Sequence, residues 1–178
     1  DQFSYELFKF PTTLNARLNS SWPRIMCFSN FVWNARLTNE FARQIKSHSP
    51  ETVIIFGGPN FPLTDEARRE YMHERPYIDF YIKWDGEIAF VELLRALQTD
   101  NFDADALKRM RPMIPNLCYL SNGAFIEGPD QRVLEFSTLP SPYLAGTLDE
   151  FFSEDLDILF ETNRGCPYSC TFCNDGHQ

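Results

Sequence analysis

The sequence lacks the glycine-rich loops that cradle nucleotide phosphates: neither G-x-G-x-x-G nor a Walker-type loop occurs in its 178 residues. No apolar run approaches the roughly 20 residues of a membrane span, and no signal-peptide pattern is present. Basic residues are few, with 16 Lys and Arg against 25 Asp and Glu, which gives a formal net charge of −9. These absences disfavour a nucleotide-phosphate site, nucleic-acid binding and docking on an anionic membrane face.

Cysteine and histidine are also scarce, with five cysteines and three histidines. An odd number of cysteines without a secretory segment argues against a disulfide framework and favours a reduced, cytoplasmic compartment. Hydrophobic residues make up 43% of the chain and aromatic residues 15%. We therefore expect a packed core, in a chain long enough for one domain or for one domain plus part of another.

Three of the five cysteines fall close together near the end of the chain. Cys166, Cys170 and Cys173 are spaced C-x3-C-x2-C and follow an apolar run, residues 156–162, that is predicted to be a strand. Three thiolates on one short loop can converge on a single soft metal centre. A [4Fe–4S] cluster held by three cysteines leaves one iron open, whereas structural zinc takes four ligands, and His177 could complete a Cys3His set.

The first hundred residues alternate short apolar runs with amphipathic segments, a pattern typical of a parallel sheet with helices on both faces. The predicted strands are 25–28, 53–56 and 78–82. In such sheets, ligands bind outside the carboxyl ends of the strands. The loops 29–34, 57–60 and 85–87 therefore form one candidate rim.

The remaining segments are read from turn and capping signals. Pro11 is expected to interrupt the first segment. Asn122-Gly123, between two apolar runs, predicts a hairpin, and residues 147–150 read as a capping box that opens a short helix. Cys27 and Cys118 lie in predicted strands and are expected to be buried.

The cysteine phrase resembles the radical S-adenosylmethionine (SAM) superfamily. The flanks 164–167 and 170–173, together with the three rim loops and the linker 139–146, resemble the subgroup with an N-terminal cobalamin-binding domain. One feature departs from many such domains, which carry a D-x-H-x-x-G motif whose histidine ligates cobalt. None of the three histidines here lies in that motif. Either the motif precedes Asp1, or cobalt has no histidine ligand in this member.

The resemblance implies an α/β fold and a division of the chain. Residues 1–100 would form a Rossmann-like (flavodoxin-like) parallel-sheet cobalamin-binding domain, incomplete at its N-terminus. Residues 101–150 would form a helix, hairpin and linker, and residues 151–178 the first strand and cluster loop of a truncated partial (β/α) barrel. A whole barrel needs roughly 200 residues or more, so the chain reads as a fragment that is not expected to cleave SAM by itself.

The resemblance also implies cofactors and residue roles. Cys166, Cys170 and Cys173 would each hold one iron of a [4Fe–4S] cluster whose open iron binds SAM, and Phe172 would line SAM through its backbone. No catalytic side chain is assigned. The residues expected to contact cobalamin are Ser29, Asn30, Asn34, Gly57, Gly58, Asp85, Gly86 and Glu87.

The implied activity is reductive cleavage of SAM, with methyl transfer to an unreactive carbon of a small-molecule or natural-product substrate as the leading outcome. The electron donor would be a flavodoxin or ferredoxin, and neither nucleic acid nor membrane is an expected partner. A methylthiotransferase needs three further cysteines, and only Cys27 and Cys118 remain. The alternative is a cobalamin-binding or interaction module with a structural Cys3His zinc site and no radical chemistry.

Overall fold

The computed structural model describes residues 3–133, 135–152, 168, 170 and 171. Internal contacts divide the chain into two compact units, Asp1–Leu139 and Pro140–Gln178. In the described part of the chain, no helix has both the length and the apolar character needed to cross a bilayer.

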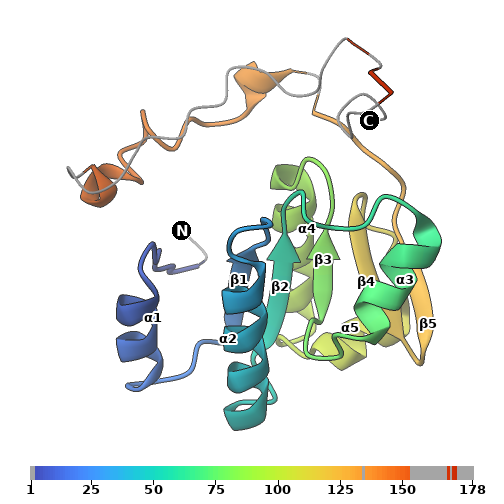
Figure 1. The fold of residues 1–178 in the computed structure, drawn as a ribbon, viewed down its shortest axis with the longest axis horizontal. Helices are drawn as coiled ribbons and strands as arrows, with labels where there is room; N and C mark the ends of the chain where they lie inside the picture. The colour runs from blue at the N-terminus through green and yellow to red at the C-terminus, as the bar shows by residue number, and fades with distance from the viewer. Residues whose placement is uncertain (1–2, 134, 153–167, 169, 172–178) are drawn as a thin grey trace. The chain divides into compact units, whose positions relative to one another are not determined.

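The first unit is built on one five-stranded sheet with the order β1-β2-β3-β4-β5 (Figure 1). The strands are β1 (Ile25–Ser29), β2 (Val53–Gly57), β3 (Phe80–Ile82), β4 (Leu117–Ser121) and β5 (Ala124–Glu127). The first three strands are parallel, as predicted, whereas β4 is antiparallel to β3 and β5 to β4. The predicted hairpin is therefore confirmed, and it extends the sheet instead of standing apart from it.

The hairpin turn has the backbone that its sequence predicts. Asn122 and Gly123 have φ values of 50° and 77°. Positive φ at both central residues belongs to the type I′ turn, whose twist matches that of the two strands.

Helices cover both faces of the sheet, as the sequence predicts (Figure 1). They are α2 (Ala35–His48), α3 (Asp65–His73), α4 (Glu87–Thr99) and α5 (Ala104–Met110). In β2, Ile54 and Phe56 pack with α2 and α3 on one face, while Val53 and Ile55 pack with α4 and α5 on the other. All four side chains are at most 3% exposed, because β2 lies inside the sheet between two helical layers.

Two expectations about the first segments are wrong. Pro11 does not interrupt structure but opens helix α1 (Pro11–Leu18), at a position where the missing N–H costs no hydrogen bond. Cys27 is exposed, because its strand β1 lies at the end of the sheet order, whereas Cys118 in β4 is buried as expected.

Short 3₁₀ turns follow the sheet at η1 (Phe136–Thr138) and, in the second unit, at η2 (Asp149–Phe151). The predicted helix near residue 150 is therefore a single turn. Its N-cap is Leu148, without a side-chain capping bond, so the capping-box prediction is wrong. The predicted strand 156–162 lies outside the described residues.

Candidate functional site

The three loops expected to form a rim begin at one edge of the sheet. Ser29 at the end of β1 is paired with Gly57 at the end of β2, and Gly57 with Ile82 at the end of β3. The chain therefore leaves all three parallel strands at the same level, the carboxyl edge of the sheet (Figure 1). This edge brings together the residues expected to contact cobalamin.

Asn30, the first residue after β1, holds the first two loops together and has no exposed surface. Its Nδ2 lies 3.0 Å from each of three acceptors, the Asn60 carbonyl oxygen and the hydroxyl oxygens of Tyr71 and Tyr81, which share its two N–H groups. Its Oδ1 accepts from Asn60 Nδ2 at 3.3 Å. The Tyr81 hydroxyl in turn donates to the Gly58 carbonyl at 2.8 Å. We call these five residues the amide bracket. The Asn30 side chain is therefore bonded entirely within the protein.

The two phenols of the amide bracket stay protonated at neutral pH. Burial is the largest influence on both, and it raises the pKa of Tyr81 and of Tyr71 above the usual tyrosine value. Each hydroxyl therefore keeps the proton that it needs to act as a hydrogen-bond donor.

The neighbouring glycines of the second loop have different roles. Gly58 has φ +122°, and a Cβ there would lie 2.8 Å from the carbonyl oxygen of Asn30, so the fold itself requires glycine. At Gly57 the nearest atom to an added Cβ is the Ile82 carbonyl oxygen at 3.6 Å, which is ordinary contact. A side chain at Gly57 is therefore compatible with its immediate surroundings.

The loop after β1 is pinned from within and presents apolar side chains outward. Asn34 Nδ2 donates to the Ser29 carbonyl and hydroxyl oxygens at 3.1 Å, and its Oδ1 accepts from the Phe31 N–H at 2.8 Å. Val32 and Trp33 are 78% and 76% exposed, with the Trp33 ring stacked on Phe31 at 4.6 Å between centroids. The sequence reasoning did not single these two residues out, although large apolar residues between a strand and a helix were the available signal.

The loop after β3 carries Asp85, Gly86 and Glu87. Gly86 is the N-cap of α4 and Glu87 is the first residue of that helix. The Asp85 side chain is turned into the protein, where its Oδ2 accepts from the Val133 N–H at 2.7 Å and from Arg132 Nε at 3.1 Å. This loop thus joins the carboxyl edge to the segment that follows β5.

No metal centre can be assembled from the residues that the structure describes, among which no group of three or more His, Cys, Asp or Glu side chains converges. Cys170 is described and half-buried, whereas Cys166, Cys173, Phe172 and His177 lie outside the described residues. Burial raises the pKa of the Cys118 thiol to about 12, so that cysteine is kept protonated and is a poor metal ligand.

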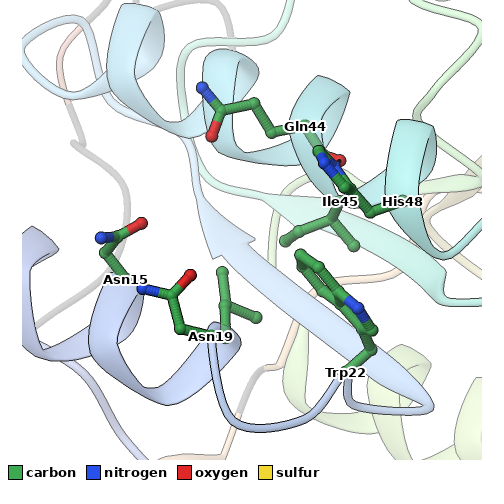
Figure 2. Close-up of a pocket in the computed structure, with 7 residues that line it drawn as sticks. Asn15, Asn19, Trp22, Gln44, Ile45 and His48 are labelled. Carbon is green, nitrogen blue, oxygen red and sulfur yellow. Dashed lines mark hydrogen bonds between the residues drawn. The ribbon is translucent and has the colours of Figure 1, made fainter.

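The opposite, amino edge of the sheet holds none of the predicted residues. His48 and His73 are the last residues of α2 and α3, which run back from the carboxyl edge. A pocket of about 180 Å³ lies there between α1 and α2, with Trp22 stacked on His48 at 5.5 Å between centroids (Figure 2). Its other lining residues are Asn15, Leu18, Asn19, Gln44 and Ile45.

No family model matches the chain, but individual relatives do. It is 32% identical over 161 residues to the cobalamin-dependent radical SAM methyltransferase TokK of Streptomyces tokunonensis. It is 33% identical over 161 residues to a 2-(S-pantetheinyl)-carbapenam-3-carboxylate methyltransferase of Streptantibioticus cattleyicolor. Each match covers 86% of this chain and 22% of the relative, so the chain spans about a fifth of their length.

A more distant relative and a solved structure agree with these matches. The hopanoid C-3 methylase of Methylococcus capsulatus is 26% identical over 160 residues, which cover 85% of this chain and 28% of that protein. The solved structure of OxsB, described as a cobalamin-dependent SAM radical enzyme, superimposes with a TM-score of 0.63 at 22% identity. That match covers 91% of this chain and 21% of OxsB. It confirms the Rossmann-like α/β fold predicted from the sequence.

Proposed function

Because the chain is homologous to a segment of the cobalamin-dependent radical SAM enzymes, we propose that it is part of such an enzyme and binds cobalamin at the carboxyl edge of its sheet. The observation that carries the proposal is the match to the two methyltransferases over 86% of the chain. The C-x3-C-x2-C phrase at 166–173 supports it independently, because three thiolates are the ligand set of a cluster with one open iron.

The described residues of the carboxyl edge fit a large flat cofactor. Val32 and Trp33 offer exposed apolar surface in the loop after β1, and Ser29 at the end of that strand is also exposed. Gly57 leaves the end of β2 without a side chain, so a planar ring can approach the backbone there. We propose that direct contacts come from Ser29, Gly57, Gly86 and Glu87, with Val32 and Trp33 added to them, and that Asn34, whose side chain is bonded within its own loop, holds that loop in shape. Asn30, Gly58 and Asp85 would act by holding the loops in shape.

The cluster would be held by Cys166, Cys170 and Cys173, with the backbone at Phe172 beside SAM. When bound, the cluster and cobalamin supply the one-electron reduction and the methyl-carrying chemistry of the reaction. The chain's own contribution is to bind and orient these groups. We keep the proposed division of the chain into a cobalamin-binding domain, residues 1–100, a helix, hairpin and linker, residues 101–150, and the start of the cluster-binding domain, residues 151–178.

Methyl transfer to an unreactive carbon of a small molecule is the activity we propose for the whole enzyme. Two of the relatives are methyltransferases by name, and one of them is named for a carbapenam carboxylate. A flavodoxin or ferredoxin would supply the electron, and the cytoplasm would keep the thiols reduced. We do not expect nucleic acid or membrane as a partner, and we expect the 178-residue chain alone not to cleave SAM.

Anaerobic reconstitution with iron and sulfide tests the cluster. We expect a brown protein with broad absorption near about 400 nm, as thiolate-bound iron–sulfur clusters give. A colourless protein that takes up one zinc ion and no iron contradicts the proposal and supports a Cys3His zinc site instead.

Substitution of one cysteine separates the cluster from the fold. Cys170→Ala should abolish cluster assembly, because a required thiolate is lost, while urea unfolding of the sheet stays as in the wild type, because Cys170 lies in the second unit. Cys118→Ala is the matched control and should keep the cluster. Retention of the full iron content by Cys170→Ala would contradict the role of Cys170 as a cluster ligand. Global unfolding of that variant would contradict the separation of the cluster from the sheet.

A further inference from the structure

Three consecutive residues after β3 all bind the segment that follows β5. Lys83 Nζ forms an ion pair with Asp130, Trp84 Nε1 donates to Asp130 Oδ1 at 3.3 Å, and Asp85 Oδ2 accepts from the Val133 N–H at 2.7 Å. The side chains of Lys83 and Asp85 are only 4% and 6% exposed. Lys83 is also paired with Glu127 of β5, so its charge stays compensated, whereas the buried Asp85 carboxylate would lose its bonds to Arg132 and Val133 if this segment moved away.

The side-chain amide of Asn116 bonds both backbone groups of Gln131, as the backbone of a neighbouring strand would. Its Oδ1 accepts from the Gln131 N–H at 2.8 Å, and its Nδ2 donates to the Gln131 carbonyl at 2.6 Å and to the Asp85 carbonyl at 2.9 Å. The residue is 2% exposed and has a left-handed backbone, with φ 60°. One side-chain amide therefore ties both backbone groups of Gln131 to the loop that begins α4.

Two guanidinium groups lie close to the Trp84 ring. The Arg68 and Arg132 Cζ atoms are 5.6 Å and 5.9 Å from its ring centroid, which is within the range of a cation–π contact. Arg68 is itself fixed by the carbonyls of Pro62 and Leu63, at 2.8 Å and 2.9 Å. The φ of Trp84 is 56°, which is uncommon for a bulky residue. Such a backbone conformation is kept only where surrounding contacts hold it in place.

We propose that Lys83, Trp84, Asp85 and Asn116, which we call the linker clamp, are positioning residues that fix where the chain leaves the sheet. They hold residues 130–133 against the loop that carries Gly86 and Glu87. The segment that leads on to the cysteines therefore leaves the sheet at its carboxyl edge. The assignment of this edge to cobalamin rests on the proposed function, whereas the clamp itself rests on the contacts above. Asp85 then acts through Val133 and not as a cobalamin ligand.

Hydrogen exchange at single amides of the 178-residue chain tests the clamp without any cofactor. In Asp85→Ala the Val133 amide should exchange at least about tenfold faster than in the wild type, because it loses a bond to a buried charge. Asp85→Asn keeps an acceptor oxygen and should restore most of the protection. An unchanged Val133 rate in Asp85→Ala overturns the proposal.

Asp79→Ala is the matched control. Asp79 is an equally buried carboxylate whose Oδ2 accepts from the Ile54 N–H at 2.8 Å, away from residues 130–133. Loss of the Asp79 carboxylate should speed hydrogen exchange at the Ile54 amide. The Val133 amide should exchange no faster, relative to the other amides of the sheet, than it does in the wild type. If Asp79→Ala releases Val133 as strongly as Asp85→Ala does, the effect is general destabilisation and the clamp assignment is wrong.

A titration with hydroxocobalamin separates this proposal from the previous one. The wild type and Asp85→Asn should bind with dissociation constants within about threefold of each other. A tenfold loss in Asp85→Asn, with Val133 still protected, makes Asp85 a ligand and overturns its positioning role. If the wild type binds no cobalamin, the proposed function fails while the exchange results still decide the clamp.

Discussion

The two halves of the carboxyl edge are held together by different kinds of bond. The amide bracket joins the loops after β1 and β2 through neutral amide and phenol groups around Asn30. The linker clamp joins the loop after β3 to residues 130–133 through buried charges, with Lys83 and Asp85 at its centre. The bracket should therefore be insensitive to acid, whereas the clamp should weaken as the pH falls below about 4.

The largest effect is expected from removing the centre of the amide bracket. Asn30→Ala leaves the Asn60 carbonyl and two phenols without the donor that a fully buried side chain supplied. We expect the free energy of unfolding to fall by about 3 kcal/mol, the cost of several unsatisfied buried polar groups. Urea unfolding at pH 7 measures it. A loss below about 1 kcal/mol would mean that water replaces the amide and that the bracket is not closed.

An intermediate effect is expected at the glycine inside the bracket. Gly58→Ala places a Cβ at 2.8 Å from the Asn30 carbonyl oxygen in a left-handed backbone, and should cost about 2 kcal/mol. Gly57→Ala, one residue earlier, has room for its methyl group and should change stability by less than about 1 kcal/mol. Equal losses in the two variants would refute the distinction drawn between these glycines.

The smallest effect is the pH dependence of the clamp. Burial acts to raise the pKa of Asp130, but the hydrogen bond and charge of Lys83 outweigh it, so that pKa lies below its usual value. A carboxyl group of this kind stabilises the fold above its unfolded pKa of about 3.9 and loses that contribution as pH falls through the lower folded value. For Lys83, burial acts to lower the pKa, but the hydrogen bonds to Asp130 and Glu127 outweigh it, so that pKa is raised. The stability that Lys83 contributes to the fold is therefore lost only above its unfolded pKa of about 10.4.

Urea unfolding of Asp130→Asn across this range checks the sign. The wild type should be the more stable protein at pH 7, and the difference should shrink as pH falls below about 4. The difference between wild type and Asn30→Ala should stay constant over the same range, because the raised pKa values of Tyr71 and Tyr81 keep both phenols protonated. A difference for Asp130→Asn that does not change with pH would remove the contrast between the two halves.

Much of the fold could be predicted because local signals agree with the tertiary structure. Four consecutive apolar residues, 53–56, gave a central strand, and Asn122-Gly123 gave a hairpin turn. Thr64 caps α3 by accepting from the Ala67 N–H, a role for which threonine is a preferred residue. The exposure of Cys27 was missed, because a short apolar run does not reveal whether its strand lies inside the sheet or at its edge.

The sequence predicted which loops form the candidate site, but it did not predict which residues their side chains contact. The order of strands and loops places Asn30, Gly58 and Asp85 at the carboxyl edge, yet their side chains and backbone bind residues as distant in the chain as Tyr81 and Val133. Such long-range pairings leave no periodic trace in a sequence. A polar residue after a strand therefore looks the same whether it faces a ligand or supports a loop.

Cobalamin binding by the 178-residue chain is the most direct test of the central claim. After incubation with hydroxocobalamin and gel filtration, we expect the wild type and Gln98→Trp, on the exposed end of α4, to remain red. Gly57→Trp should lose binding at least about tenfold, because its side chain occupies the carboxyl edge, while urea unfolding confirms that it is folded. A colourless wild type, or a folded Gly57→Trp that binds as the wild type does, would contradict the account.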